Sequence, residues 1–287
     1  MQLKTVDYTF ALLTPCFSGT ALGKNDDHAE MRVPPIRGHV RFWHRELFGA
    51  NDANQVWGST SGDEGRGGRV GMRLAAGHLS DKQPADILPH DLKKSGNPRP
   101  SLREGGKFMI YLQRLIGCTN NDWDHAQRAV KTWLLLGCLG LRSNRAAGSV
   151  WPLDDWARTD ADSLKSTLIS LGLKNWSVAI VGLSAGKSEA VLRETASDTI
   201  AGSPHRQVFG GISPREPSLT KFKVALLAPR SAEKETPCLL ALAPHRQLQG
   251  NGGVRRTILK EAEHLLWNVK PNPARWKALG AWSHILP

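Results

Sequence analysis

The stretch Pro34–Phe48, PPIRGHVRFWHRELF, decides the architecture of the first half of this chain. Its two prolines stand where a helix begins, because the first N–H groups of a helix need no partner. The apolar residues recur at helical spacing on one face: Ile36, Val40, Trp43 and Leu47. The pattern predicts an amphipathic helix from Ile36 to Phe48 that packs on a sheet and turns a basic face outward.

Segments typical of strands lie on both sides of this helix. The expected elements in chain order are strand Thr5–Thr14, helix Ile36–Phe48, strand Arg69–Leu74, strand Lys107–Leu115, helix Trp123–Cys138 and a short strand after Gly148. Asn121 or Asp122 is the expected cap of the second helix. The polar, proline-bearing stretch 79–106 is expected to be an insertion or mobile loop. The order β-α-β-β-α-β is the ferredoxin-like arrangement.

The second half has a weaker pattern. Its expected elements are helix Ser163–Leu171, strand Trp176–Val181, strands Phe222–Leu227 and Cys238–Ala243, and helix Thr257–Trp267. The order of its strands in a sheet does not follow from the sequence. We predict an α+β protein with two ferredoxin-like (RRM-like) domains, 1–155 and 156–287, of which the second is more divergent.

The composition indicates a partner with many negative charges. The chain has 287 residues, and 38 Lys and Arg against 26 Asp and Glu give a formal net charge of +12. A protein this basic commonly binds nucleic acid, because neutralising phosphates releases condensed counterions. A generically basic protein without such a partner is the alternative.

Other features exclude several classes of protein. The first residues contain one lysine and no long apolar segment, so no signal peptide is expected. No run approaches the roughly 18 apolar residues of a membrane span. The cysteines are far apart and form no CxxC pair: Cys16, Cys118, Cys138 and Cys238. We therefore expect a reduced, cytoplasmic protein with no disulfide framework, no metal site and no cofactor.

Two groups of basic residues are candidates for binding RNA. The first lies on the helix beside its apolar face and consists of Arg37, Arg41, His44 and Arg45. The second is a loop bounded by glycines, with Arg142, Ser143, Asn144 and Arg145. Arginine binds phosphate with two hydrogen bonds, and glycine lets backbone approach it. The alternatives are a solvated helix face and an ordinary glycine-rich turn.

Two short matches to catalytic motifs are not favoured. Gly182–Gly186, GLSAG, fits the nucleophile elbow of hydrolases, but no βα series precedes it and no glycine-rich oxyanion segment is evident. Gly186–Ser188 resembles the end of a P-loop, whose first glycine would have to stand at Val181. A hydrolase and an ATPase are therefore not expected.

Four segments together resemble a known family. In order they are Leu13–Gly19 (LTPCFSG), Glu30–Arg45 (EMRVPPIRGHVRFWHR), Val56–Gly62 (VWGSTSG) and Gly140–Ser149 (GLRSNRAAGS). They resemble the N-terminal half of the first Cmr subunits, members of the RAMP superfamily of CRISPR proteins in type III-B effectors. Three positions depart from the family pattern: Thr20 and Ala146 replace glycines, and His44 replaces a tryptophan.

The resemblance implies two ferredoxin-like domains in a non-catalytic subunit. Such a subunit would contact the 3′ region of the guide RNA, the target RNA and other Cas subunits, including the backbone RAMP subunits, and not a membrane. It would recognise backbone and A-form shape, because guide and target pair with each other. The expected contacts are the two basic groups and, with less support, Lys24, Arg66 and Arg69.

Two alternatives stay open. Backbone RAMP subunits cut target RNA with an aspartate in the loop after the first strand, so the chain is alternatively a metal-dependent endoribonuclease. The candidate residues are Asp26, Asp27 and His28, the last as a general base. The other alternative is a basic protein that works outside CRISPR, in the ribosome or in RNA processing.

Overall fold

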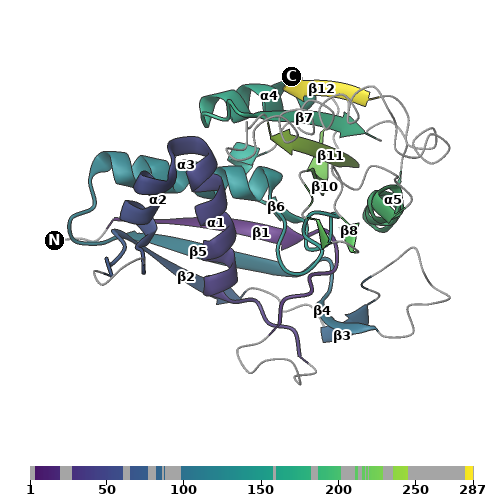
Figure 1. Ribbon diagram of the computed structural model, residues 1–287, viewed down its shortest axis with the longest axis horizontal. Helices are drawn as coiled ribbons and strands as arrows, with labels where there is room; N and C mark the ends of the chain where they lie inside the picture. The colour runs from purple at the N-terminus through teal and green to yellow at the C-terminus, as the bar shows by residue number, and fades with distance from the viewer. Residues whose placement is uncertain are drawn as a thin grey trace.

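The computed structural model describes the chain over residues 4–19, 28–60, 65–76, 82–85, 87, 98–157, 160–181, 187–201, 211–212, 215–216, 218, 220–228, 235–244 and 282–286. Within these residues the chain forms two four-stranded sheets and two small two-stranded sheets. Helices pack on each large sheet (Figure 1). No helix in this part of the chain is both long enough and apolar enough to cross a membrane.

The first large sheet has the strand order β2-β5-β1-β6, and all of its pairings are antiparallel. Its strands are β1 (Thr5–Leu12), β2 (Val70–Ala76), β5 (Lys107–Arg114) and β6 (Val150–Pro152). The first and third of these strands in chain order lie in the centre, and the second and fourth lie at the edges. This is the ferredoxin-like order, so the β-α-β-β-α-β arrangement predicted from the sequence is confirmed.

Three helices pack against this sheet and against one another: α1 (Val33–Phe48), α2 (Ala50–Trp57) and α3 (Asn120–Leu136). The sequence did not predict α2, whose eight residues are too few to show a helical period. Gly49 and Gly58 delimit it with positive φ angles of 91° and 83°. The predicted cap of α3 is wrong, because Thr119 caps it and Asp122 completes the capping box from within the helix.

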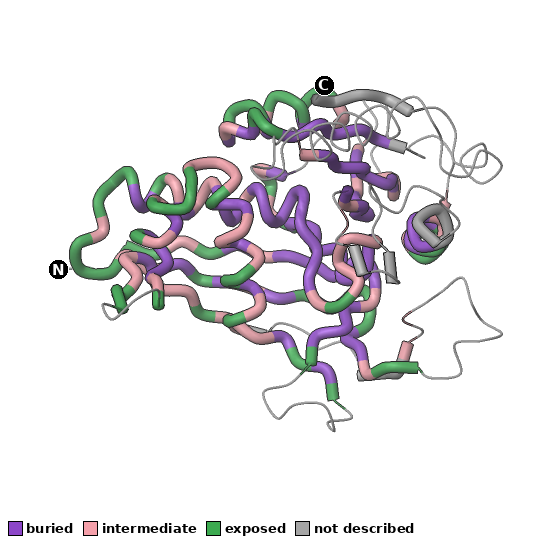
Figure 2. Tube along the Cα trace, in the orientation of Figure 1, coloured by how far each residue is buried: buried purple, intermediate pink, exposed green. Residues whose placement is uncertain are grey.

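The main core lies between this sheet and its helices, where buried segments concentrate (Figure 2). Along β5 the residues Phe108, Ile110 and Leu112 are buried, as the alternation predicted. Phe10 on β1 stacks on Phe108 and meets Trp133 of α3 edge-on at 5.4 Å between ring centroids. Burying each such aromatic side chain contributes about 2 kcal/mol, so this layer fixes where α3 lies.

The second large sheet has the order β10-β11-β7-β12, again with antiparallel pairing throughout. Its strands are β7 (Trp176–Val181), β10 (Lys221–Leu227), β11 (Thr236–Pro244) and β12 (Trp282–Leu286). The structure therefore supplies the order that the sequence did not. In chain order it repeats the first sheet, with the first and third strands central. The associated helices are α4 (Ala161–Ser170) and α5 (Glu189–Ala201).

The remaining elements are short. They are β3 (Lys82–Ala85), β4 (Arg99–Leu102), η1 (Asp155–Ala157), β8 (Gly211–Ile212) and β9 (Arg215–Glu216). β3 and β4 pair with each other within the stretch 79–106 that was expected to be an insertion. The expected helix Thr257–Trp267 lies outside the described residues. The division of the chain at 155/156 stays a prediction.

The two large sheets are joined through the glycine-bounded loop after α3. Its backbone pairs with Phe222 of β10: the N–H of Ala146 donates to the carbonyl of Phe222 at 3.0 Å, and the N–H of Phe222 donates to the carbonyl of Asn144 at 3.1 Å. The N–H of Val224 donates to Ser149 Oγ at 3.0 Å. The loop therefore covers the edge strand of the second sheet, whose N–H groups would otherwise lack partners.

Candidate nucleic-acid interface

The basic face of α1 is only partly as predicted. Arg37 and Arg45 are exposed, so their guanidinium groups can reach a partner. Arg41 is half-buried, and its Nη2 donates to Oδ1 of Asn54 on α2. That hydrogen bond holds part of the Arg41 guanidinium against α2. Arg37 and Arg45 have no ion pair with a described carboxylate.

The prediction that His44 belongs to this outward basic face is wrong, because its side chain is completely buried. The side chain of this α1 residue lies where α1, α2 and α3 meet, and its ring meets that of Trp57 edge-on. Burial lowers its pKa, although the hydrogen bond with Asp52 opposes the shift. His44 is therefore neutral at physiological pH and is excluded from contact with RNA.

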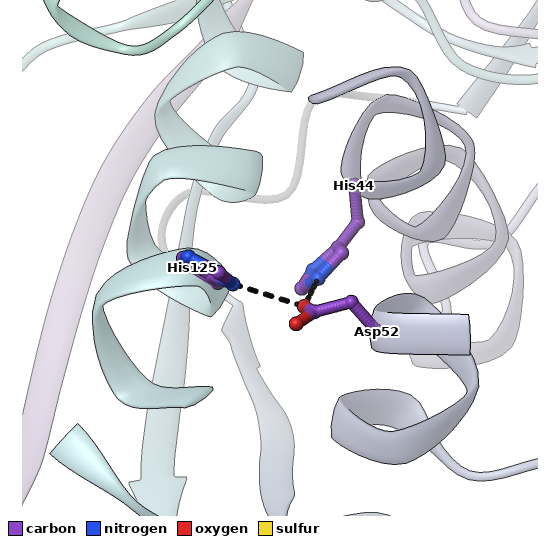
Figure 3. Close-up of side chains that lie close together, drawn as sticks. All are labelled: His44, Asp52 and His125. Atoms are coloured by element: carbon purple, nitrogen blue, oxygen red, sulfur yellow. Dashed lines mark hydrogen bonds and ion pairs between the residues drawn. The ribbon is translucent and has the colours of Figure 1, made fainter. Parts of the chain in front are cut away.

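A polar cluster of His44, Asp52 and His125 joins the three helices (Figure 3). Asp52 Oδ1 lies 2.6 Å from His44 Nε2 and 3.0 Å from His125 Nδ1. Trp57 Nε1–H donates to His44 Nδ1 at 2.9 Å, so the proton of the neutral imidazole is on Nε2 and points at Asp52. A metal ion at this position would have to bind His44 Nε2 through the lone pair that already holds this proton. The cluster therefore fits a hydrogen-bond network better than a metal centre, although its three ligand atoms lie within 4.8 Å of one another.

The glycine-bounded loop, Gly140–Ser149, is held against the segment that follows β1. Thr14 Oγ1 donates to the carbonyl of Ala146 at 2.6 Å and accepts from the N–H of Ser149 at 2.9 Å. The N–H of Gly148 donates to the carbonyl of Pro15 at 2.9 Å. Two segments that are more than a hundred residues apart in the sequence therefore fold as one unit.

The backbone of this loop requires glycine at Gly148. Its φ is +62°, and a Cβ there would lie 1.9 Å from the carbonyl oxygen of Leu139, which no real contact allows. Arg142 and Ala146 also have positive φ angles, 62° and 60°. Ala146 therefore adopts the left-handed conformation with a side chain, at a cost of about 1 kcal/mol that the surrounding hydrogen bonds offset.

Arg142 and Arg145 are the two arginines of the loop. In the part of the chain that the structure describes, neither guanidinium has a hydrogen bond or an ion pair. Burial lowers the pKa of both, that of Arg145 to about 10 with a contribution from Arg142, and both stay charged at neutral pH. Two partly desolvated cations beside each other repel and favour an anion between or over them.

Next to these arginines is a pocket of about 350 Å³ between α1, the loop and β10. The predicted residues Ser143 and Asn144 line it, together with Lys221 of β10, whose Nζ donates to Asn144 Oδ1 at 2.7 Å. The Lys221 ammonium also lies 5.0 Å from the centroid of Phe42 on α1. Sequence reasoning missed Lys221, although the alternation Lys221, Phe222, Lys223 in a strand places both lysines on one face.

Lys223 is buried completely in the junction between the two halves. Its Nζ donates to the carbonyl of Leu134 near the end of α3 at 2.6 Å and lies 5.5 Å from the centroid of Trp151. Burial lowers its pKa to about 7, with a smaller opposing effect of Cys138. Lys223 therefore links β10 to α3 and has no contact with solvent.

The three weaker candidates for RNA contact, Arg66, Arg69 and Lys24, have different surroundings. Arg66 is exposed, whereas Arg69 forms an ion pair with the buried Asp122 at 3.0 Å. Burial raises the pKa of Asp122, but hydrogen bonds from Thr119, Arg69 and Gln55 outweigh it and hold the pKa at about 2. Arg69 thus stabilises the start of α3. Lys24 lies outside the described residues. Among the residues of the endoribonuclease alternative, His28 is exposed, and Asp26 and Asp27 also lie outside the described residues.

Comparison with known proteins places this arrangement among solved structures. The family model of the RAMP superfamily matches residues 9–151. The crystal structure of Cmr1 from Pyrococcus furiosus in its apo form is similar over 100% of this chain and 99% of that chain, with a TM-score of 0.63 and 17% identity. No curated protein matches.

A second solved structure has the same fold. It is a chain of a type III-B Cmr-beta complex bound to cognate target RNA and AMPPnP in the presence of ssDNA. The similarity covers 93% of this chain and 100% of that chain, with a TM-score of 0.56 and 12% identity. At these identities the likenesses establish the fold of both halves.

Proposed function

This chain belongs to the RAMP superfamily, and from that membership we propose that it is an RNA-binding subunit of a type III CRISPR effector with no reaction of its own. It contacts the 3′ region of the guide RNA, the target RNA or both, and it packs against other Cas subunits in the cytoplasm. The proposal needs no cofactor.

One observation carries the proposal: Arg142 and Arg145, which have no partner among the described residues, lie on a loop that backbone hydrogen bonds hold in place. Partly buried guanidinium groups without a carboxylate are typical of a site that takes phosphate. Arg37 and Arg45, exposed on α1, extend the positive surface, and the net charge of +12 favours a polyanion.

The likeness to a chain of an RNA-bound Cmr-beta complex supports the same conclusion. In such an effector the guide and target pair with each other, so a subunit of this kind recognises phosphates and A-form geometry rather than base sequence. Arginines on a helix face and on a rigid loop suit that task, because they bind backbone without reading base edges.

The experiment that tests this function is the salt dependence of RNA binding by the full chain. We expect Arg37→Ala and Arg145→Ala each to weaken binding of a labelled single strand and of an RNA duplex, and to reduce the slope of log K against log salt by about one. Fluorescence anisotropy across a NaCl series measures both. Arg73→Ala, at an exposed arginine on β2, is the matched control for loss of charge.

Unchanged affinity and slope in both variants would remove these arginines from the interface. Absence of RNA binding by the wild-type chain and by its complexes would end the RNA-binding proposal itself. The non-catalytic part has its own test, which is incubation of bound RNA with Mg²⁺. Cleavage that disappears in Asp27→Ala would establish the endoribonuclease alternative, whereas intact RNA retires it.

A further inference from the structure

The pocket between the two halves has a composition that the contact with phosphate does not explain. It has a volume of about 350 Å³, in the range of small-molecule sites, and is open to solvent on one side. One wall is aromatic: the half-buried Phe42 of α1 lines it, and the buried Trp43 meets the ring of Phe42 edge-on at 5.3 Å between ring centroids. A site for phosphate alone needs no such wall.

Three polar groups of this pocket have no partner within the described residues. They are the ring nitrogens of His39, the hydroxyl of Ser143 and the amide nitrogen of Asn144, whose Oδ1 already accepts from Lys221. Because polar groups in partly buried places are normally hydrogen-bonded, these are open to a ligand. Together they offer both donors and acceptors to a planar group that lies in the pocket.

His39 supplies a neutral ring and not a second cation. Burial and, to a smaller extent, the nearby Lys221 ammonium lower its pKa to about 4. At physiological pH the imidazole therefore has one donor and one acceptor nitrogen. Lys221 is left as the cation of the pocket, with no described carboxylate in contact.

We propose that this pocket takes one unstacked nucleobase of the bound RNA, with that nucleotide's phosphate on Lys221. The inference rests on the proposed function and deepens it: the chain holds the backbone through its arginines and captures one base that is not paired. Aromatic stacking and a few hydrogen bonds to the base edge are the way in which proteins recognise single-stranded RNA. The neighbouring Arg142 and Arg145 hold the adjacent phosphates.

The test compares two single-stranded RNAs of equal length, one complete and one with abasic residues throughout its centre. We expect the full wild-type chain to bind the complete RNA about tenfold more tightly, since stacking contributes about 1 to 3 kcal/mol per base. In His39→Leu and Ser143→Ala this ratio falls to about threefold or less. Neither side chain has a partner among the described residues, so both variants are expected to fold.

The controls separate this inference from the proposed function. Arg37→Ala lowers both affinities by the same factor and leaves the ratio unchanged, and Arg73→Ala leaves it unchanged as well. If wild-type protein binds both RNAs equally, or if the pocket variants keep the full ratio, the base-capture site is wrong while RNA binding stands. If neither RNA binds, the proposed function fails first.

A second measurement locates the base directly. RNA that carries 4-thiouridine is crosslinked to the full chain by light, and the attached peptide is identified by mass spectrometry. We expect crosslinks within 35–43, 136–138, 143–144 or 221–222, the segments that line the pocket. Crosslinks confined to other segments, such as the outer face of the first sheet, would overturn the assignment.

Discussion

The two large sheets of this chain have the same strand order but place different groups at the junction between them. The first sheet carries three helices, and its loop after α3 presents arginines to solvent. The second sheet turns its edge strand β10 toward the first, where Lys221 lines the pocket and Lys223 is buried in the junction. The comparison teaches that one topology can supply either the loop at the junction or the edge strand that packs against it.

The difference has a chemical cause in the residues that face the junction. In the first half, glycines and a threonine fix a loop whose two arginines have no partner among the described residues. In the second half, two lysines at alternate positions of one strand point back into the protein and donate to Asn144 and to the carbonyl of Leu134. The three predictions below test this division of roles.

The largest effect on stability is expected at Gly148, the backbone position on which the geometry of the loop depends. Gly148→Ala would place a methyl group 1.9 Å from the carbonyl oxygen of Leu139 at a φ of +62°. The loop and its contact with β10 cannot keep their geometry, so we expect a loss of about 3 kcal/mol or more in the free energy of unfolding. Urea denaturation of the full chain measures it.

Gly38→Ala is the matched control for this prediction. Gly38 lies within α1, and a Cβ there meets nothing within 4 Å. Alanine is a better helix former than glycine, so the control is expected to gain up to about 1 kcal/mol. An equal loss in both variants would show that the loop is not the sensitive point of the junction.

The next effect tests the buried lysine of the second half. Lys223 has a pKa of about 7 in the folded protein, far below its unfolded value, so between pH 7 and pH 10 the unfolded chain binds more protons. Stability from this group therefore rises with pH across that window and is lost as pH falls toward 7. Lys223→Met lacks the dependence, so the wild type should gain about 2 kcal/mol relative to the variant between pH 7 and pH 9.

Denaturation curves of both proteins at several pH values measure that difference. Taking the difference also cancels the titration of Tyr8, Cys16 and Cys238, whose pKa values burial raises in both proteins. Lys174→Met, at an exposed lysine, controls for the loss of a positive charge. A constant difference between wild type and Lys223→Met would mean that β10 does not bury its lysine in the junction.

The smallest effect lies within the first half. Trp57→Phe removes the N–H that donates to His44 Nδ1 at 2.9 Å and leaves that buried nitrogen without a partner. We expect a loss of about 1 kcal/mol in unfolding free energy, measured in urea, and a smaller loss for the half-buried control Trp156→Phe. No loss in Trp57→Phe would mean that His44 has another tautomer and that the case against a metal at this cluster no longer holds.

Much of the first half was predictable because its signals are local. The spacing of Ile36, Val40 and Trp43 predicted α1, and the alternation of Phe108, Ile110 and Leu112 predicted β5. The departures have physical reasons. Eight residues are too short a helix to show a period in α2. At His44, a position on the border between the apolar and basic faces became buried when α2 folded over it.

The sequence by itself determined the basic character of this chain, the first ferredoxin-like unit and the arginines of the glycine-bounded loop, because charge, period and turn chemistry are local properties. Tertiary structure alone decided the strand order of the second sheet and the meeting of Lys221 with His39 and Asn144 in one pocket. Those residues are distant in the chain, so only the packing of β10 against the loop brings them together. Long-range pairing leaves no period in the sequence, which is why the pocket could not be predicted from it.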